Sequence, residues 1–309
     1  MFDRKNPGRL YSRWNGGDMV IYPGDAGPGD EYFVDATNGS ATNSGKSWEH
    51  ALITIDAAVN LCTANNGDRI YVAPFHTETL AADSAIDIDV AGVSVVGVLQ
   101  GRQMPTLSVT ATAGDCKLAA DNVMIQNIRF TGDIDETTGC IEVTGDDCAV
   151  IDCEYRDVTG QATDVLVTDN ALRLLVDGFR VIGAAGDGGD TAIMLDECDN
   201  AVIRNCDFIG NFDLGAIECR TTASDDIRIR DCTIKTSGSE DLCILDTITG
   251  STGIIGPNIF MQLADDAANI TTAITGATFV VMDVGVHVVN AVDEKSMAIN
   301  WTASTDGQE

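Results

Sequence analysis

The sequence predicts an all-β chain folded as a right-handed parallel β-helix, a solenoid whose short strands form coils that stack on one another. Two observations predict this fold. Similar segments recur with spacings of 24 to 29 residues, and each copy holds short β-prone runs bounded by polar turns. Long internal periods are typical of repeat architectures, and the absence of a helical pattern within the copies excludes helical repeats and doubly wound sheets.

The repeat is clearest in the segments 123–131, 149–156, 202–209 and 227–235. They share a polar residue at Asn127, Asp152, Asn205 and Asp231. Three positions later comes an aromatic or aliphatic residue which, with two weaker copies, forms the series Phe130, Tyr155, Phe179, Phe208, Ile234 and Phe260. A second series is Ile141, Val165, Ile193, Ile217 and Cys243. Equivalent side chains of stacked coils lie above one another, so both series are predicted to point into the core.

Cysteines follow the same repeat. The chain has 10 of them, without a CxxC pair or a zinc-like Cys/His cluster. Cys153, Cys206 and Cys232 each come directly after the shared polar residue. Buried cysteine behaves as a small apolar side chain, and the first residues lack the apolar stretch of a secretory signal. We therefore expect reduced thiols in the core.

The remaining segments have distinct roles in this prediction. Residues 1–30 are rich in Gly and Pro and are expected to form an arm or linker. Residues 31–262 form the β-helix, with a capping helix at 47–66 that begins at Ser47 and has an apolar stripe of Trp48, Leu52, Ile55, Val59 and Cys62. Such a helix would cover the open end of the solenoid. Residues 263–309 are β-rich and form a last coil, a cap or an oligomer contact.

Charge restricts the partners. The formal net charge is −30 and the pI is near 4.1, so binding to nucleic acid or to an anionic membrane is not expected. The N-terminal 14 residues differ, because Arg4, Lys5, Arg9 and Arg13 face only Asp3, a net charge of +3. A basic arm on an acidic body is typical of docking onto an acidic partner, and the alternative is a disordered terminus whose charge has no function.

Parts of the chain resemble a family of tailed-phage virion proteins. The resembling residues include YFVDATNGSATNSGKSWEHALITIDAAV and GDRIYVAPFHTETL near the start, and later GNFDLGAIECRTT and GPNIFMQLADDAANIT. The resemblance covers roughly residues 31–275. It implies a β-helix with a pectate-lyase-like fold in a structural component of the particle. The family has no diagnostic catalytic motif to compare.

An enzymatic role has its own candidates, because many β-helix proteins act on polysaccharides. Inverting hydrolysis requires two carboxylates about 6.5–9.5 Å apart. Asp225 and Asp226, with Arg228, are the candidate catalytic set. The polygalacturonase pattern is incomplete, because the NTD and GHG segments are missing, and adjacent acidic residues are also common in turns.

Calcium is the one cofactor for which the sequence offers candidates. Asp133, Asp135, Asp187 and Asp190 lie in two Gly- and Asp-rich turns. Calcium prefers clustered carboxylate and carbonyl oxygens, yet neither turn matches a known calcium loop. Solvated acidic turns without a bound ion are the favoured explanation of both segments.

Together these features predict a non-enzymatic structural protein of a phage particle, a capsid decoration or cement protein anchored by its basic arm. Its partner would be the major capsid protein or another virion protein, and the resemblance implies a homotrimer. It would be made in the host cytoplasm and lie on the virion surface. The alternative is a tail spike, receptor-binding protein or polysaccharide depolymerase, either hydrolase or lyase, on the same fold.

Overall fold

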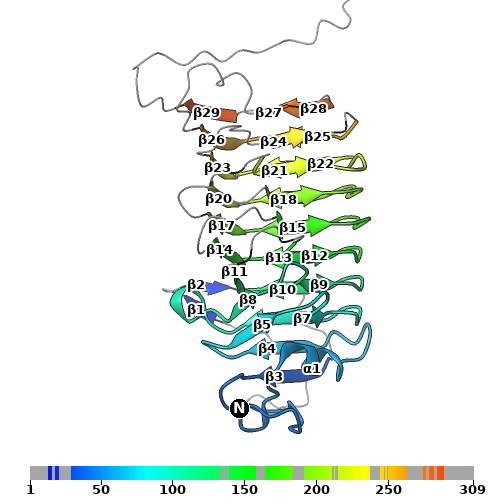
Figure 1. Ribbon diagram of the computed structural model, residues 1–309, viewed down its shortest axis with the longest axis vertical. Helices are drawn as coiled ribbons and strands as arrows, with labels where there is room; N and C mark the ends of the chain where they lie inside the picture. Colours follow the sequence, from blue (N-terminus) through cyan, green and yellow to red (C-terminus); the bar gives the residue numbers. More distant parts are fainter. Residues whose placement is uncertain are drawn as a thin grey trace, which may run out of the picture.

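The computed structural model describes residues 13–15, 18–20, 29–132, 134, 137, 139–157, 164–183, 191–210, 212, 215–236, 244–246, 248, 250–262, 274–275, 278–281 and 284–288. From β3 onward, the described strands form three parallel sheets. β3 pairs with β4, and from β4 onward each strand pairs with the strand three places later in the chain. The coils therefore stack along one axis into a rod, from β3 to β29 (Figure 1). The predicted parallel β-helix is confirmed.

The three sheets are named here by their order within a coil. Sheet I consists of β3 (Glu31–Val34), β4 (Arg69–Val72), β7 (Ser94–Gly97), β10 (Met124–Gln126), β13 (Ala149–Ile151), β16 (Leu175–Asp177), β19 (Val202–Arg204), β22 (Ile227–Arg230), β25 (Thr252–Ile255) and β28 (Thr278–Val281). Sheet II consists of β5 (Thr77–Leu80), β8 (Thr106–Val109), β11 (Arg129–Gly132), β14 (Glu154–Asp157), β17 (Arg180–Ile182), β20 (Asp207–Gly210), β23 (Thr233–Thr236), β26 (Asn258–Gln262) and β29 (Val284–Val288). Sheet III consists of β6 (Ile86–Asp87), β9 (Cys116–Leu118), β12 (Ile141–Val143), β15 (Asp164–Thr168), β18 (Thr191–Leu195), β21 (Ile217–Cys219), β24 (Ile244–Asp246) and β27 (Ile274–Thr275).

A few described elements lie outside these sheets. The strands β1 (Arg13–Asn15) and β2 (Asp18–Val20) form an antiparallel pair. The 3-10 helices are η1 (Trp48–His50) and η2 (Gly101–Gln103), and the α-helix is α1 (Ile55–Val59). Within the described ranges, no helix is long and apolar enough to span a bilayer.

The polar residue shared by the repeats forms the corner between sheet I and sheet II. Asn127, Asp152, Asn205 and Asp231 have φ between 50° and 56°, and Gly178 takes this position in the weaker copy with φ of 70°. Left-handed backbone favours Gly, Asn and Asp, which explains why these residue types recur there. The next residue then turns back into the core.

The core confirms most of the predicted stacking and corrects two positions. Phe130 pairs with Tyr155, Phe208 with Ile234, and Ile234 with Phe260. Between them the stack continues through Val181, not Phe179. Phe179 directly follows the corner glycine, so it occupies the position that cysteine holds in neighbouring coils. In the second series Leu166, not Val165, pairs with Ile141 and Ile193.

The cysteines follow the prediction where they are described. Cys153, Cys206 and Cys232 are buried, and their thiols donate to carbonyls two residues earlier, at Sγ–O distances of 3.4, 3.1 and 3.2 Å. No disulfide forms among the described cysteines. Cys243 lies outside the described residues.

The capping helix is shorter than the predicted 47–66. Ser47 makes no capping hydrogen bond, and α1 instead begins after Thr54, whose hydroxyl accepts from the Ala57 amide at 3.3 Å. The helix cannot start earlier because Leu52 bridges to Val34 on the open edge of β3. Pairing that edge satisfies backbone groups which a longer helix would leave exposed. α1 still packs its buried residues Ile55, Ala58 and Val59 against the first coils.

Candidate functional site

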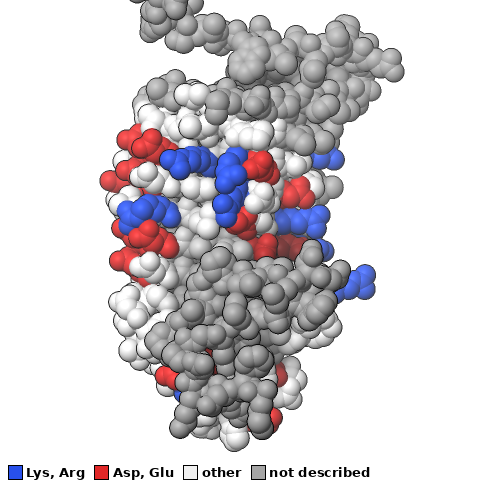
Figure 2. Space-filling view, turned by 180° about the vertical axis from the view of Figure 1, so that it is seen from behind, with Lys and Arg blue, Asp and Glu red and all other residues white. Residues whose placement is uncertain are grey.

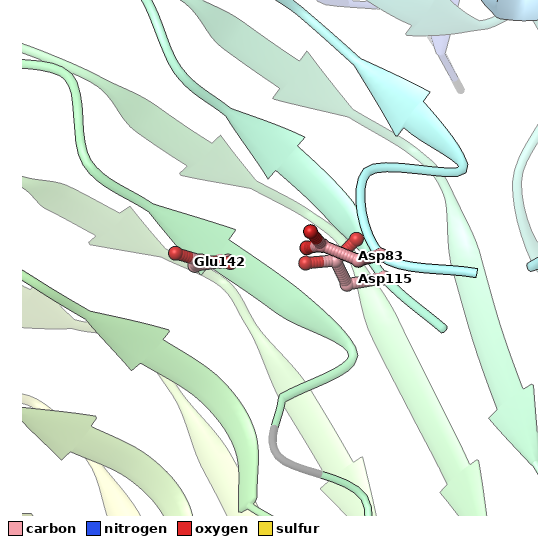
Figure 3. A group of neighbouring side chains, drawn as sticks. All are labelled: Asp83, Asp115 and Glu142. Atoms are coloured by element: carbon pink, nitrogen blue, oxygen red, sulfur yellow. The ribbon is translucent and has the colours of Figure 1, made fainter. Parts of the chain in front are cut away.

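The outer face of sheet III brings together three carboxylates from three consecutive coils. Asp83 precedes β6, Asp115 immediately precedes β9, and Glu142 lies in β12 (Figure 3). Cys116 and Ile141 pair and point into the core, so Asp115 and Glu142, their sequence neighbours, point outward. One oxygen from each carboxylate lies within 4.8 Å of the others.

Asp115 is the buried member of this cluster, at 5% exposure, whereas Asp83 is exposed and Glu142 is half-buried. The Ser84 amide donates to Asp115 Oδ1 at 2.5 Å. Burial, followed by the contact with Glu142, raises the pKa of the Asp115 carboxyl to about 7. Asp115 therefore holds a proton at pH values where an ordinary aspartate is ionised.

A single lysine sits on the other side of Glu142. Lys117 Nζ lies 2.8 Å from Glu142 Oε1, because the two residues are paired on adjacent strands. This hydrogen bond raises the pKa of Lys117. Asp87 of the preceding coil pairs with Lys117, and its pKa is raised by burial and by Asp89. Among the described residues, its buried Oδ1 finds no hydrogen-bond partner.

The cluster offers two kinds of chemistry. Three converging carboxylate oxygens are ligands that calcium prefers. A protonated carboxyl beside a second carboxylate is also the arrangement of an acid and its partner in glycoside cleavage. The four calcium candidates Asp133, Asp135, Asp187 and Asp190 lie outside the described residues, so the structure neither joins nor separates them.

A second polar cluster lies further along sheet III. Arg220, which directly follows β21, contacts Glu218 in that strand and reaches Asp164 two coils away, with Nη1 3.0 Å from Asp164 Oδ2. Thr191 also donates to Asp164, at 2.6 Å. Glu218 is 1% exposed and Asp164 8%. Burial lowers the pKa of Arg220, but the two carboxylates raise it by more, so the guanidinium stays charged and links β15 to β21.

The predicted catalytic set lies on a different edge of the rod. Asp225 and Asp226 form the turn from sheet III to sheet I, and exposed Arg228 follows in β22. Asp225 accepts a hydrogen bond from the Thr252 hydroxyl at 2.9 Å, and Asp226 has left-handed backbone with φ of 56°. The hydrogen bond and the left-handed backbone both support the turn geometry. Their catalytic role stays a prediction.

The basic arm cannot be placed. Arg4, Lys5 and Arg9 lie outside the described residues, and only the backbone of Arg13 is described, in β1. The carboxylate cluster, in contrast, is described but was not predicted from the sequence. The one available signal was the alternation in Cys116–Leu118 and Ile141–Val143, which predicts that Lys117 and Glu142 point outward from equivalent positions.

Comparisons with known proteins bear on the fold. No family model matches the chain, and no curated protein does. Among solved structures, a rhamnogalacturonan lyase is similar at 11% identity, over 88% of this chain and 90% of that one, with a TM-score of 0.50. A GH136 lacto-N-biosidase from Eubacterium ramulus also matches at 11% identity, over 84% and 68%, with a TM-score of 0.34. The relationship to phage virion proteins stays a prediction, whereas the likeness to the lyase shows that the two chains share the β-helix fold.

Proposed function

We propose that the protein cleaves polysaccharides at the outer face of sheet III, with Asp115 and Glu142 as the reacting pair. The single observation that carries this proposal is the buried, proton-holding Asp115 with a carboxylate oxygen within 4.8 Å of one on Glu142. The shared fold alone would not support an activity, because one fold hosts many functions. It is consistent with the proposal that a structure sharing the fold is named as a rhamnogalacturonan lyase.

One oxygen of Asp115 lies within 4.8 Å of one oxygen of Glu142, which is closer to the spacing of retaining than of inverting hydrolases. Retaining enzymes hold their carboxyl groups about 5–5.5 Å apart, whereas inverting ones keep about 6.5–9.5 Å for a water molecule. Asp115 would donate its proton to the glycosidic oxygen as the bond to C1 breaks, while a Glu142 oxygen bonds to C1. Water then displaces Glu142 from C1 and gives its proton to Asp115. Lys117 positions Glu142 through the hydrogen bond to Oε1.

The activity test uses purified protein on a panel of pectic and capsular polysaccharides, with reducing ends measured as product. Asp115→Asn and Glu142→Gln are each expected to lower kcat about 100-fold or more. Because Asp115 must carry a proton, wild-type activity should fall as the pH rises through the pKa of about 7. Asp169→Asn, an exposed turn residue after β15, is the matched control and should leave the rate unchanged.

Several outcomes would contradict this site. Cleavage that survives both variants would remove the pair, and loss only in Asp225→Asn or Asp226→Asn would move the reaction to the turn. A product with an unsaturated sugar end would indicate elimination instead of hydrolysis. Failure to cleave any polysaccharide in the panel would reject the proposed activity.

A capsid decoration role is the second candidate, and the charge asymmetry of the sequence favours it. With +3 on the N-terminal 14 residues, the remainder carries −33. If the arm docks the protein on a virion protein, deleting residues 1–16 should abolish binding to purified particles while circular dichroism shows an intact β-rich body. Particle binding by the truncated protein would contradict the docking role. Sedimentation of the full chain tests the expected trimer.

A further inference from the structure

Basic side chains gather on the outer faces of sheets I and II, most of them beside the corner where the two sheets meet. They project from consecutive coils between β11 and β23, and they are Arg129, Arg156, Arg180, Arg204, Arg228, Arg230 and Lys235. Figure 2 shows Lys and Arg side chains interspersed with Asp and Glu in the upper half of one face of the rod. This set of seven residues is called the basic strip. Five coils at about 4.8 Å spacing give it a length of roughly 20 Å.

The strip arises from register. Arg204 and Arg230 are paired, each the last residue of its strand in sheet I. Across the corner, Arg129 is the first residue of β11 and Arg180 is the first residue of β17. Both pair with Glu154, the first residue of β14, which lies between them. In sheet I the same outward position thus holds a cation in two neighbouring coils, and in sheet II it alternates between a cation and a carboxylate, although the chain as a whole carries a net charge of −30.

Carboxylates lie between these cations without outnumbering them. Glu154 contacts both Arg129 and Arg156, Asp177 lies 2.7 Å from Arg204, Asp207 3.3 Å from Arg180, and Asp231 3.0 Å from Arg230. Asp152 is the fifth acidic residue at this corner. Arg228 and Lys235 form no ion pair with any residue in the described ranges. The strip is therefore locally cationic on an acidic rod.

The cationic groups are accessible and repel one another. The side chains of Arg156, Arg180 and Arg230 are 50%, 47% and 44% exposed. Burial, and after it the charges of Arg129 and Arg180, lowers the pKa of Arg156. An anion bound among these guanidinium groups would relieve that repulsion and form charge-assisted hydrogen bonds.

We infer that the basic strip binds an anionic, uronate-containing polysaccharide lengthwise along the rod, which rests on the proposed function and narrows its substrate class. The mixture of charges favours this occupant. Arginine forks match sugar carboxylates, and the intervening Asp and Glu accept hydrogen bonds from sugar hydroxyls. Single-stranded DNA has no free sugar hydroxyl within its chain, so the carboxylates of the strip would repel its phosphates without accepting such hydrogen bonds.

The test measures binding of polygalacturonate by calorimetry, using the Asp115→Asn variant so that cleavage does not consume the polymer. Binding should weaken as salt rises, and neutral dextran should not bind. Adding Arg228→Gln with Lys235→Gln should weaken binding about fivefold. The matched control adds Lys46→Gln with Arg173→Gln, which removes two cations elsewhere and should leave binding nearly unchanged.

The outcomes separate this inference from the activity. Binding of polygalacturonate that depends on the strip supports the inference even if the wild type never cleaves the polymer. Equal weakening by the strip and control variants, stronger binding of single-stranded oligothymidylate, or absence of polygalacturonate binding would overturn it. In the last case, cleavage of a neutral polysaccharide would leave the proposed activity standing without the strip.

Discussion

Replacing Phe208 with alanine is expected to lower the free energy of unfolding by about 4 kcal/mol. Phe208 is fully buried in β20, where it pairs with Val181 on one side and Ile234 on the other. The ring of Phe179 packs edge-on against it, with 6.2 Å between the centroids. Hydrogen bonds between coils fix the strand spacing, so the surrounding chain cannot close the cavity.

Equilibrium unfolding in guanidinium chloride measures this loss. Phe208→Leu is the control, because it keeps most of the volume and should cost only about 1 kcal/mol. Each coil of a solenoid contacts its neighbours alone, so amide exchange should accelerate most in β17, β20 and β23. An alanine variant that loses less than about 1 kcal/mol would show that neighbouring coils collapse into the space.

The fold was predictable because two kinds of position are constrained in every coil. Inward positions must be apolar, and the corner between sheets I and II needs left-handed backbone, which selects Asn, Asp or Gly. Where a copy has no Asn or Asp at the corner, the prediction of the stacked residue was wrong. At Gly178 it assigned Phe179 to the stack instead of Val181. The helix at 47–66 failed for another reason. The apolar positions within α1 are buried as expected, but Leu52 forms a bridge to the open edge of β3. Helical periodicity does not reveal such a bridge.

The candidate site could not be predicted in the same way. Asp83, Asp115 and Glu142 come from three coils of different length, and sequence spacing alone does not say which outward positions become neighbours. The chain has 48 acidic residues, and in the sequence the adjacent pairs such as Asp225 and Asp226 attract attention. Asp115 differs from this exposed pair by its burial, which the sequence does not show. The basic strip was hidden likewise, because four of its coils contribute a single cation each and only the coil of β22 and β23 contributes three.

Removing the guanidinium of Arg220 is expected to be the second large loss, about 3 kcal/mol for Arg220→Met. Methionine keeps the apolar stem but leaves Glu218 and Asp164, both almost fully buried, without their counter-charge. Such uncompensated buried charges cost far more than a surface ion pair contributes. Chemical denaturation with circular dichroism detection measures the change.

Arg173 supplies the matched comparison, because it also bridges two carboxylates but at the surface. Its side chain is 46% exposed, and its partners Asp146 and Asp147 are 33% and 43% exposed. Arg173→Met should therefore cost much less stability than Arg220→Met. Adding Glu218→Gln to Arg220→Met should restore part of the stability, since the amide carries no charge. Equal losses at both arginines would mean that the burial of Glu218 and Asp164 does not govern the stability of sheet III.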